Sequence, residues 1–221
     1  MEILLSAKNI SKTFQGRRVL DNIDVEINNA EIIAISGSSG AGKTTLLNIL
    51  STLDKPDESN KSSLIIDNEE IFSLGKNGLA NLRNQKIGFV FQFHELIPEL
   101  SVLENVCLPG WIKKDNDVKK KAEELLKYFG LEDFTNKKPL TLSGGEKQRV
   151  AIARSLVNNP KIIFADEPTG NLDSKNSKIL FDLFFKLRDD YNCSVVIVTH
   201  DENSANICDR KLLIVDGKIK N

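Results

Sequence analysis

The clearest chemical signal in the sequence is the stretch GSSGAGKT over residues 37–44. It matches the pattern G-x-x-x-x-G-K-[ST], follows a strand-like apolar segment and precedes a helix-forming one. Glycines let backbone N–H groups approach phosphate oxygens closely, and the start of the helix adds positive potential. Lys43 would bring a charge to the β- and γ-phosphates, and the Thr44 hydroxyl is a suitable ligand for Mg²⁺. A glycine-rich turn without a ligand is the less favoured interpretation, because a strand and a helix flank the motif. The predicted phosphate cradle consists of Gly37, Ser38, Ser39, Gly40, Ala41, Gly42, Lys43, Thr44 and Thr45.

Two acidic residues, Asp166 and Glu167, follow the apolar segment IIFA. Strands of an open α/β sheet end at the ligand crevice, so these carboxylates would face the nucleotide. We expect Asp166 to hold Mg²⁺ through a water molecule, and Glu167 to orient and deprotonate the attacking water. The same two acids after an isolated strand would indicate a solvated loop. The phosphate cradle favours the catalytic interpretation.

Two further polar residues end predicted strands. Gln92 closes the segment IGFVFQ, and His200 closes SVVIVTH. His200 is either a structural hydrogen-bonding residue or a contact that senses the γ-phosphate. Gln92 is either a polar strand terminus or a side chain placed at the metal and the attacking water. The residues alone leave both alternatives open.

A serine and two glycines precede a long predicted helix in the stretch LSGGEKQRVAIARSL, residues 142–156. The simplest interpretation is that Ser143 caps the helix while Gly144 and Gly145 form a turn. The stretch by itself does not show whether the glycines have a further role.

The composition is that of an ordinary folded protein of 221 residues, with 40% apolar and 28% charged residues. Thirty basic and thirty-one acidic residues leave a net charge of −1, which argues against nucleic acid as a partner, although a local basic patch stays open. The three cysteines have no paired spacing, so we expect neither a disulfide nor a zinc site. No apolar run approaches the length of a membrane span, and no cleavable signal is apparent. We therefore expect a cytoplasmic location.

Strand-like and helix-like segments alternate along the chain, which predicts an α/β sandwich. Residues 93–159 show helical patterns without a convincing strand, which suggests a helical subdomain inserted between strands of one sheet. The expected strands cover residues 3–10, 25–27, 31–36, 64–67, 87–92, 161–166 and 194–199, followed by a hairpin at Asp216-Gly217, and the expected helices cover 43–53, 79–85, 117–129, 145–157 and 174–188.

Taken in order, the cradle, Gln92, LSGGEKQ, the two acids, Asn171-Leu172-Asp173 and His200 resemble the motif set of ATP-binding cassette (ABC) ATPases. This resemblance covers nearly the whole chain. It implies an α/β fold of the P-loop NTPase ABC cassette type, with a RecA-like mixed sheet core, an antiparallel β subdomain and an inserted helical subdomain. Residues 1–221 would form one ATPase domain, with the nucleotide-binding core in 1–92 and 160–221 and the helical subdomain in 93–159.

The same resemblance implies roles for site residues and a dimer. In the family the serine-glycine-glycine element closes over the γ-phosphate held by a second subunit, so two chains enclose two ATP molecules. Asp173 would lie at that junction, and Phe14 would stack on adenine, with a core aromatic as the alternative for Phe14. The implied catalytic residues are Glu167, His200, Gln92 and Lys43, the metal ligands are Thr44, Gln92 and Asp166, and the second phosphate-binding surface is Ser143, Gly144 and Gly145, with ATP as substrate and Mg²⁺ as cofactor.

A single cassette without coiled coils or zinc modules is typical of the nucleotide-binding subunit of a transporter. That implies a homodimer formed on ATP binding, held by integral membrane permease subunits at the cytoplasmic face of the inner membrane. The segment FQFHELIPELSVLENVCLP, residues 91–109, resembles the group of lipoprotein-releasing transporters, macrolide and antimicrobial-peptide exporters and the cell-division cassette. It is most similar to the lipoprotein-releasing subunits, although Glu95 stands where these often have a second histidine. A mechanical signal relay of the cell-division type and a macrolide or antimicrobial-peptide export ATPase are the alternatives.

Apolar residues in the segment after Gln92 suggest a surface for the membrane partner. They lie in loop-rich sequence, and they either form a groove for a short partner helix or belong to the core. These residues are Phe93, Leu96, Ile97, Leu100 and Trp111.

Overall fold

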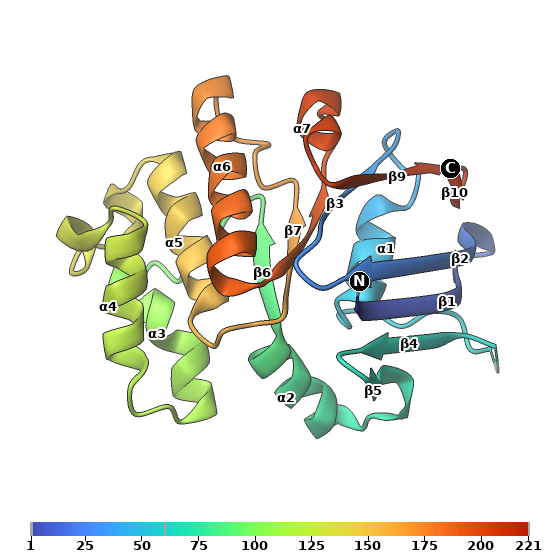
Figure 1. The fold of residues 1–221 in the computed structure, drawn as a ribbon, viewed down its shortest axis with the longest axis horizontal. Helices are drawn as coiled ribbons and strands as arrows, with labels where there is room; N and C mark the ends of the chain where they lie inside the picture. Colours follow the sequence, from blue (N-terminus) through green and yellow to red (C-terminus); the bar gives the residue numbers. More distant parts are fainter. Residues whose placement is uncertain (1, 60, 221) are drawn as a thin grey trace.

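The computed structural model describes residues 2–59 and 61–220. A six-stranded sheet forms the middle layer, with a four-stranded sheet on one side and helices α3 to α6 on the other (Figure 1). Within the described residues, no helix combines the length and apolar character that a membrane span requires. The predicted α/β architecture is confirmed.

The six-stranded sheet has the order β10-β9-β3-β8-β7-β6 and is parallel except for β10. Its inner strands are continuous apolar runs because both of their faces are buried. The four strands predicted for this sheet agree with the structure to within one residue at each end, and the predicted hairpin joins β9 and β10. The strands are β3 (Ile32–Ser36), β6 (Ile87–Phe91), β7 (Ile162–Asp166), β8 (Ser194–Val198), β9 (Arg210–Val215) and β10 (Lys218–Lys220).

The four-stranded sheet is antiparallel, with the order β2-β1-β4-β5. Its first two strands are longer than predicted, because register shifts along their pairing interrupt the alternation of apolar and polar residues. The strands are β1 (Ile3–Phe14), β2 (Arg17–Asn28), β4 (Ser63–Ile66) and β5 (Glu69–Glu70).

The five predicted helices are present, and α3 and α7 were not predicted. The expectation of loop-rich sequence up to Trp111 is wrong, because Trp111 lies in α3. This helix starts at a capping box formed by Ser101 and Glu104, but Pro109 inside it hides the helical pattern. The helices are α1 (Lys43–Leu50), α2 (Lys76–Lys86), α3 (Val102–Lys113), α4 (Val118–Tyr128), α5 (Gly144–Leu156), α6 (Ser174–Tyr191) and α7 (Glu202–Asn206), with short 3₁₀ turns η1 (Ile71–Ser73), η2 (Glu132–Phe134) and η3 (Pro139–Thr141).

Two hydrophobic cores lie on opposite faces of the six-stranded sheet. Successive residues of one strand alternate between them, as in β8, where Val196 faces the core shared with α1 and the four-stranded sheet. Its neighbours Val195 and Ile197 face the core shared with helices α3 to α6. Because the second core includes strands of the sheet as well as the helices between β6 and β7, the division at residues 93–159 stays a prediction.

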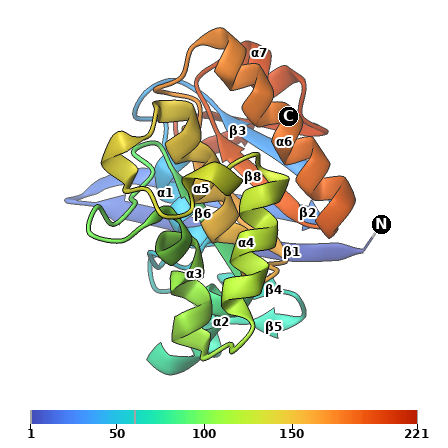
Figure 2. The same cartoon turned by 90° about the vertical axis from the view of Figure 1, so that its left-hand side faces the viewer.

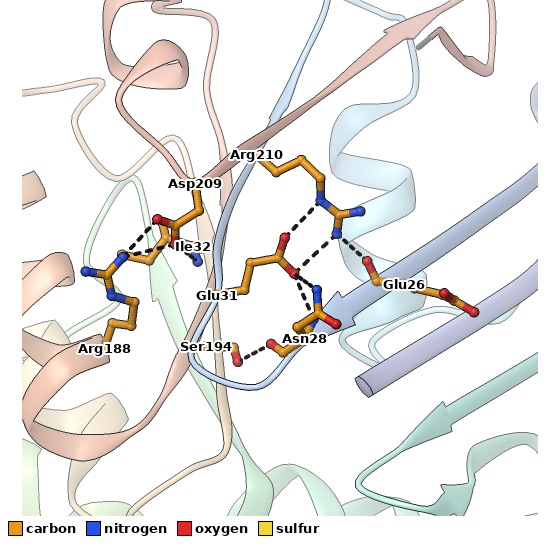
Figure 3. A network of polar contacts seen from close by, with 8 residues as sticks. All are labelled: Glu26, Asn28, Glu31, Ile32, Arg188, Ser194, Asp209 and Arg210. Atoms are coloured by element: carbon orange, nitrogen blue, oxygen red, sulfur yellow. Dashed lines mark hydrogen bonds and ion pairs between the residues drawn. The ribbon is translucent and has the colours of Figure 1, made fainter. Parts of the chain in front are cut away.

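A network of polar side chains joins the two sheets at the amino ends of β3, β8 and β9 (Figure 3). Glu31, whose side chain is 12% exposed, accepts hydrogen bonds from the backbone and the side chain of Asn28 at 2.7 and 3.1 Å. Arg210 forms an ion pair with Glu31 (Nε–Oε1, 2.9 Å) and donates to the carbonyl of Glu26. Asp209 accepts from the backbone of Ile32 and from Arg188. These contacts fix the end of β2 against the start of the central strands.

Candidate nucleotide-binding site

The phosphate cradle is a tight loop between the end of β3 and the start of α1. Gly37 has a φ of +146°, and a Cβ added to it would lie 2.3 Å from the carbonyl oxygen of Ile214, so only glycine fits there. Gly42 has a φ of +104° and is the N-cap of α1, with no side-chain cap and no acidic residue in the first turn. The first N–H groups of α1 therefore lack a side-chain acceptor and can bind an anion.

Lys43 lies folded against this loop and is 9% exposed. Its Nζ donates hydrogen bonds to the carbonyl oxygens of Gly37 and Ser38 at 2.9 and 3.1 Å. The ammonium group is thus held at the loop by neutral acceptors only, and phosphate oxygens would be stronger acceptors for the same protons. Ser39 and Gly40 are exposed at the tip of the loop, whereas Ala41 is buried beneath it.

Asp166 lies at the carboxyl end of β7, opposite Phe91 of β6 and Val198 of β8. The Thr44 hydroxyl donates to Asp166 Oδ1 at 3.4 Å, which brings together the two oxygen atoms predicted to act near Mg²⁺. Burial, and secondly the charge of Glu167, raise the pKa of the Asp166 carboxyl. A partly buried carboxylate beside a hydroxyl is a donor set that suits a hard cation. The described residues hold no cluster of three or more His, Cys, Asp or Glu side chains, so other ligands would have to come from Gln92, water and phosphate.

Glu167 has a φ of +48°, an unfavourable conformation for a residue with a Cβ. Its N–H donates to the carbonyl of Val198 at 2.9 Å, which ties the strained residue to the end of β8. Its Oε2 lies 2.5 Å from Nδ1 of His200, whose side chain is 70% exposed. The two residues predicted to act on the attacking water and the γ-phosphate are therefore in direct contact.

Gln92 follows β6 and lies against the loop after Glu167. A Cβ added to Gly170 would lie 2.7 Å from Gln92 Nε2, so the side chain depends on a glycine at this position. The side chain of Asn171 donates to the backbone carbonyl of Gln92 at 3.1 Å. The loops after β6 and β7 are thereby connected beside Asp166.

Ser143 caps α5 as the simplest interpretation predicted, in a capping box with Glu146. The expectation that Gly144 and Gly145 form a turn is wrong, because both lie in the first turn of the helix with ordinary negative φ. A Cβ added to Gly144 would meet Leu172 and Asn171 only at 3.8 and 4.0 Å. No atom of residues 2–59 or 61–220 therefore comes close enough to require glycine at position 144.

Phe14 and Asp173 lie on other elements than the cradle. Phe14 ends β1, is 46% exposed, and has Nζ of Lys12 at 5.1 Å from its ring centroid, so the interpretation as a core aromatic is wrong. Asp173 is the N-cap of α6 and accepts a hydrogen bond from the backbone of Asn176 at 2.8 Å. Hydrogen bonds from Asn176 lower the pKa of the exposed Asp173 carboxyl.

Sequence reasoning missed Arg154, which connects α5 to the segment after Gln92. The guanidinium donates to the backbone carbonyls of His94 and Glu95 at 2.8 and 2.5 Å. Both of these residues have positive φ, at 65° and 48°, so Arg154 stabilises a strained turn. The sequence signal that could have pointed to Arg154 is a single charged residue in the uncharged helix stretch IARSL.

A groove of about 590 Å³ lies between α2, β6, α3 and α5, and we call it the α2–α3 groove. Ile97, Leu108 and Ile112 are among its apolar lining residues, and Glu95 and Arg154 are among its polar ones. Of the five residues predicted to form a partner surface, only Ile97 lines this groove. Leu96 packs against the helical core instead, Leu100 is half-buried, and Phe93 and Trp111 are exposed outside the groove.

Comparisons with known proteins agree with this geometry. A family model described as ABC transporter matches residues 20–170. The lipoprotein-releasing system ATP-binding protein LolD of Bacteroides thetaiotaomicron is 48% identical, over 98% of this chain and 99% of the relative. LolD of Aquifex aeolicus is 45% identical, over 99% of this chain and 97% of the relative.

Two solved structures have the same fold. The ATP-binding cassette MJ0796, in a dimeric post-hydrolysis state bound to ADP and Pi, shares 43% identity at a TM-score of 0.87, over 98% of this chain and 97% of that chain. CbiO1 from Clostridium perfringens, part of the ABC transporter complex cbiONQ, shares 28% identity at a TM-score of 0.90, over 100% and 88% of the two chains. With the cradle and the two acids at the carboxyl edge of the sheet, these matches identify the chain as an ATP-hydrolysing cassette that belongs to the ABC transporter family.

Proposed function

We propose that this cassette powers a lipoprotein-releasing complex, in which two copies bind permease subunits at the cytoplasmic face of the inner membrane. The observation that carries the proposal is the match to proteins named LolD over 98% or more of this chain, together with an open apolar groove beside the site. A permease would bind by inserting a short cytoplasmic helix into the α2–α3 groove.

The position of Gly144 supports a shared site between two copies. Its backbone is helical and an added Cβ would meet Leu172 and Asn171 only at ordinary contact distance, so an alanine would suit the helix better within the monomer. A glycine at such a position is explained when a ligand or a second chain comes close to the backbone. We propose that this ligand is the γ-phosphate of ATP bound in the partner's cradle, met by the Ser143 hydroxyl and the first N–H groups of α5.

Within each site, Lys43 and the N–H groups of α1 would hold the phosphates. Phe14 would stack on adenine and Asp173 would lie at the dimer junction. Thr44, Asp166 and Gln92 fit a Mg²⁺ ion, which when bound neutralises charge on the β- and γ-phosphate oxygens. Glu167 would then orient the attacking water and accept its proton, while His200 moves from the carboxylate to the γ-phosphate.

The contacts of Arg154 provide a path from the site to the groove. Glu95 lines the α2–α3 groove, its carbonyl accepts a hydrogen bond from Arg154, and Arg154 lies on α5, the helix that Ser143 caps. A partner helix in the groove would therefore respond to movements of α5 when two ATP molecules close the dimer. Loss of the γ-phosphate would remove the bridging contacts and reopen the dimer.

Reconstitution with the membrane subunits tests the proposal. The chain is produced with its permease in proteoliposomes that carry a fluorescent lipoprotein, and ATP hydrolysis and lipoprotein release are measured together. We expect ATP-dependent release that is lost in the Glu167→Gln variant. Hydrolysis stimulated by the permease without lipoprotein release would contradict the proposal and favour the signal-relay or macrolide-export alternatives.

A further inference from the structure

The turn between α3 and α4 exposes two large apolar side chains. Trp111 and Ile112, in the last turn of α3, are 48% and 67% exposed. Trp111 is the only tryptophan of the chain. Neither residue belongs to the nucleotide site, and a tryptophan with half of its surface in water indicates a surface that another phase or molecule covers.

Four exposed lysines lie at the end of α3 and in the first turn of α4, on either side of the same turn: Lys113, Lys114, Lys119 and Lys120. None of them forms an ion pair within residues 2–59 and 61–220. The nearby Asp115 is already neutralised by Lys121, at 2.5 Å, and this contact lowers the pKa of its carboxyl. Of the other acids, Asp117 lies in the turn and Glu123 and Glu124 lie a turn further along α4. We call Trp111, Ile112 and the four lysines the turn patch.

The fold holds the turn patch in one place. A Cβ added to Gly110 would lie 2.1 Å from a methyl group of Val118, so the start of α4 packs directly against the end of α3. The N–H groups of Lys114 and Asp115 donate to the carbonyls of Trp111 and Gly110 at 3.0 and 2.9 Å, which closes the turn. Figures 1 and 2 show α3 and α4 side by side, with this turn at the same end of the molecule as α2.

The turn patch adjoins the surface where the permease is proposed to bind, because Ile112 also lines the α2–α3 groove. This inference rests on the proposed function in that respect. A short cytoplasmic helix of a permease would be joined to membrane spans, so a groove that binds it would face the bilayer and the adjoining turn would lie close to the cytoplasmic membrane surface.

We propose that the turn patch binds the anionic lipid headgroups of that surface. Cytoplasmic segments of membrane proteins carry an excess of Lys and Arg, so the lysines of the turn patch would repel such segments. An anionic lipid leaflet would attract the same lysines. Tryptophan with a neighbouring isoleucine suits the boundary between headgroups and acyl chains. The patch adds a lipid contact to the permease contact and orients the cassette against the membrane.

The single tryptophan makes the contact measurable in the isolated full-length chain. Trp111 emission and cosedimentation are recorded with phosphatidylcholine vesicles and with vesicles that also contain phosphatidylglycerol. We expect a blue shift and cosedimentation only with the anionic vesicles, both of them lost at about 0.5 M salt because the attraction is screened. No shift and no cosedimentation with anionic vesicles would overturn the proposal.

Charge reversal identifies the surface that binds. The double variant Lys113→Glu and Lys119→Glu should lower the bound fraction by about tenfold or more, because each lysine near an anionic surface contributes measurably. The matched control, Lys175→Glu with Lys178→Glu on the exposed face of α6, changes charge equally and should bind like the unchanged chain. Equal loss in both variants, or no loss in either, would overturn the proposal. Permease-stimulated hydrolysis in proteoliposomes is measured separately, so a failure of the proposed function is distinguished from a failure of lipid binding.

Discussion

The two edges of the six-stranded sheet are built in opposite ways. At the amino edge, Glu31 is nearly buried and accepts from backbone and side-chain donors, while Arg210 and Asp209 connect three chain segments (Figure 3). At the carboxyl edge, Glu167 has an unfavourable φ, and the Ser36 hydroxyl is buried without a hydrogen-bond partner among the described residues. The first edge therefore contributes stability, and the second keeps polar groups available for a ligand.

This difference predicts that substitutions at the two edges have separable effects. Changes at the carboxyl edge should affect turnover while the fold stays stable. Changes at the amino edge should affect stability while the affinity for ATP stays the same. Substitutions at Glu167, Glu31, Gly144 and Glu146 test that separation, in order of decreasing effect.

Glu167→Gln should lower the rate of ATP hydrolysis by about 10²–10⁴-fold, because the amide cannot accept a proton from water. Binding of ATP should persist, and the variant should accumulate as an ATP-bound dimer, which size-exclusion chromatography with scattering detects. The exposed Glu123→Gln on α4 is the matched control and should hydrolyse ATP normally. Wild-type turnover in Glu167→Gln would show that another group is the base.

Glu31→Gln should lower the free energy of unfolding by about 1–3 kcal/mol, because Arg210 loses its nearly buried partner. Urea unfolding measures this change, and the KM for ATP should not move. Glu26→Gln is the matched control, since only the backbone carbonyl of Glu26 contacts Arg210 and its side chain is exposed. A shift in KM as large as the shift in stability would contradict the separation of the two edges.

The residues of the two sheet edges are spaced differently along the chain, and this spacing decides how well each edge can be predicted from the sequence. The cradle and Asp166-Glu167 could be predicted because each is contiguous, with its strand and helix visible on either side. The network around Glu31 could not be, since its partners lie at residues 26, 28 and 210 and only the folded sheet brings them together. Arg154 was missed for the same reason, because its contacts join residues about 60 positions apart. A groove after Gln92 was predicted, but of its predicted residues only Ile97 lines it, since the other walls come from α2, β6 and α5.

Gly144→Ala should have opposite effects on the monomer and the dimer. Because Gly144 is helical and a Cβ there would clash with no described residue, alanine should raise the free energy of unfolding by up to about 1 kcal/mol. The added methyl group would meet the partner's nucleotide, so ATP-induced dimerisation should fall by about tenfold or more, which is a loss of 1.4 kcal/mol or more. Gly75→Ala, at the N-cap of α2 where an added Cβ would have no atom within 4 Å among the described residues, should leave dimerisation unchanged. Normal dimerisation of Gly144→Ala would remove the main support for a shared site.

The smallest expected effect concerns Glu146, which accepts hydrogen bonds from the side chain and backbone of Ser143 at the exposed start of α5. These bonds lower the pKa of the Glu146 carboxyl, with the side-chain bond as the larger cause. A carboxyl whose pKa is lower in the folded state stabilises the protein above its unfolded pKa, and this contribution is lost as the pH falls through the folded pKa. Glu146→Ala should therefore lower Tm near neutral pH, corresponding to less than about 1 kcal/mol, and the difference from wild type should vanish in acid. Glu146→Gln keeps an acceptor without the charge, so thermal unfolding of both variants across pH separates the hydrogen bonds from the charge. If the deficit of Glu146→Ala stays constant down to acid pH, the charge has no part in stabilising this end of α5, and the hydrogen bonds between Ser143 and Glu146 account for the whole effect.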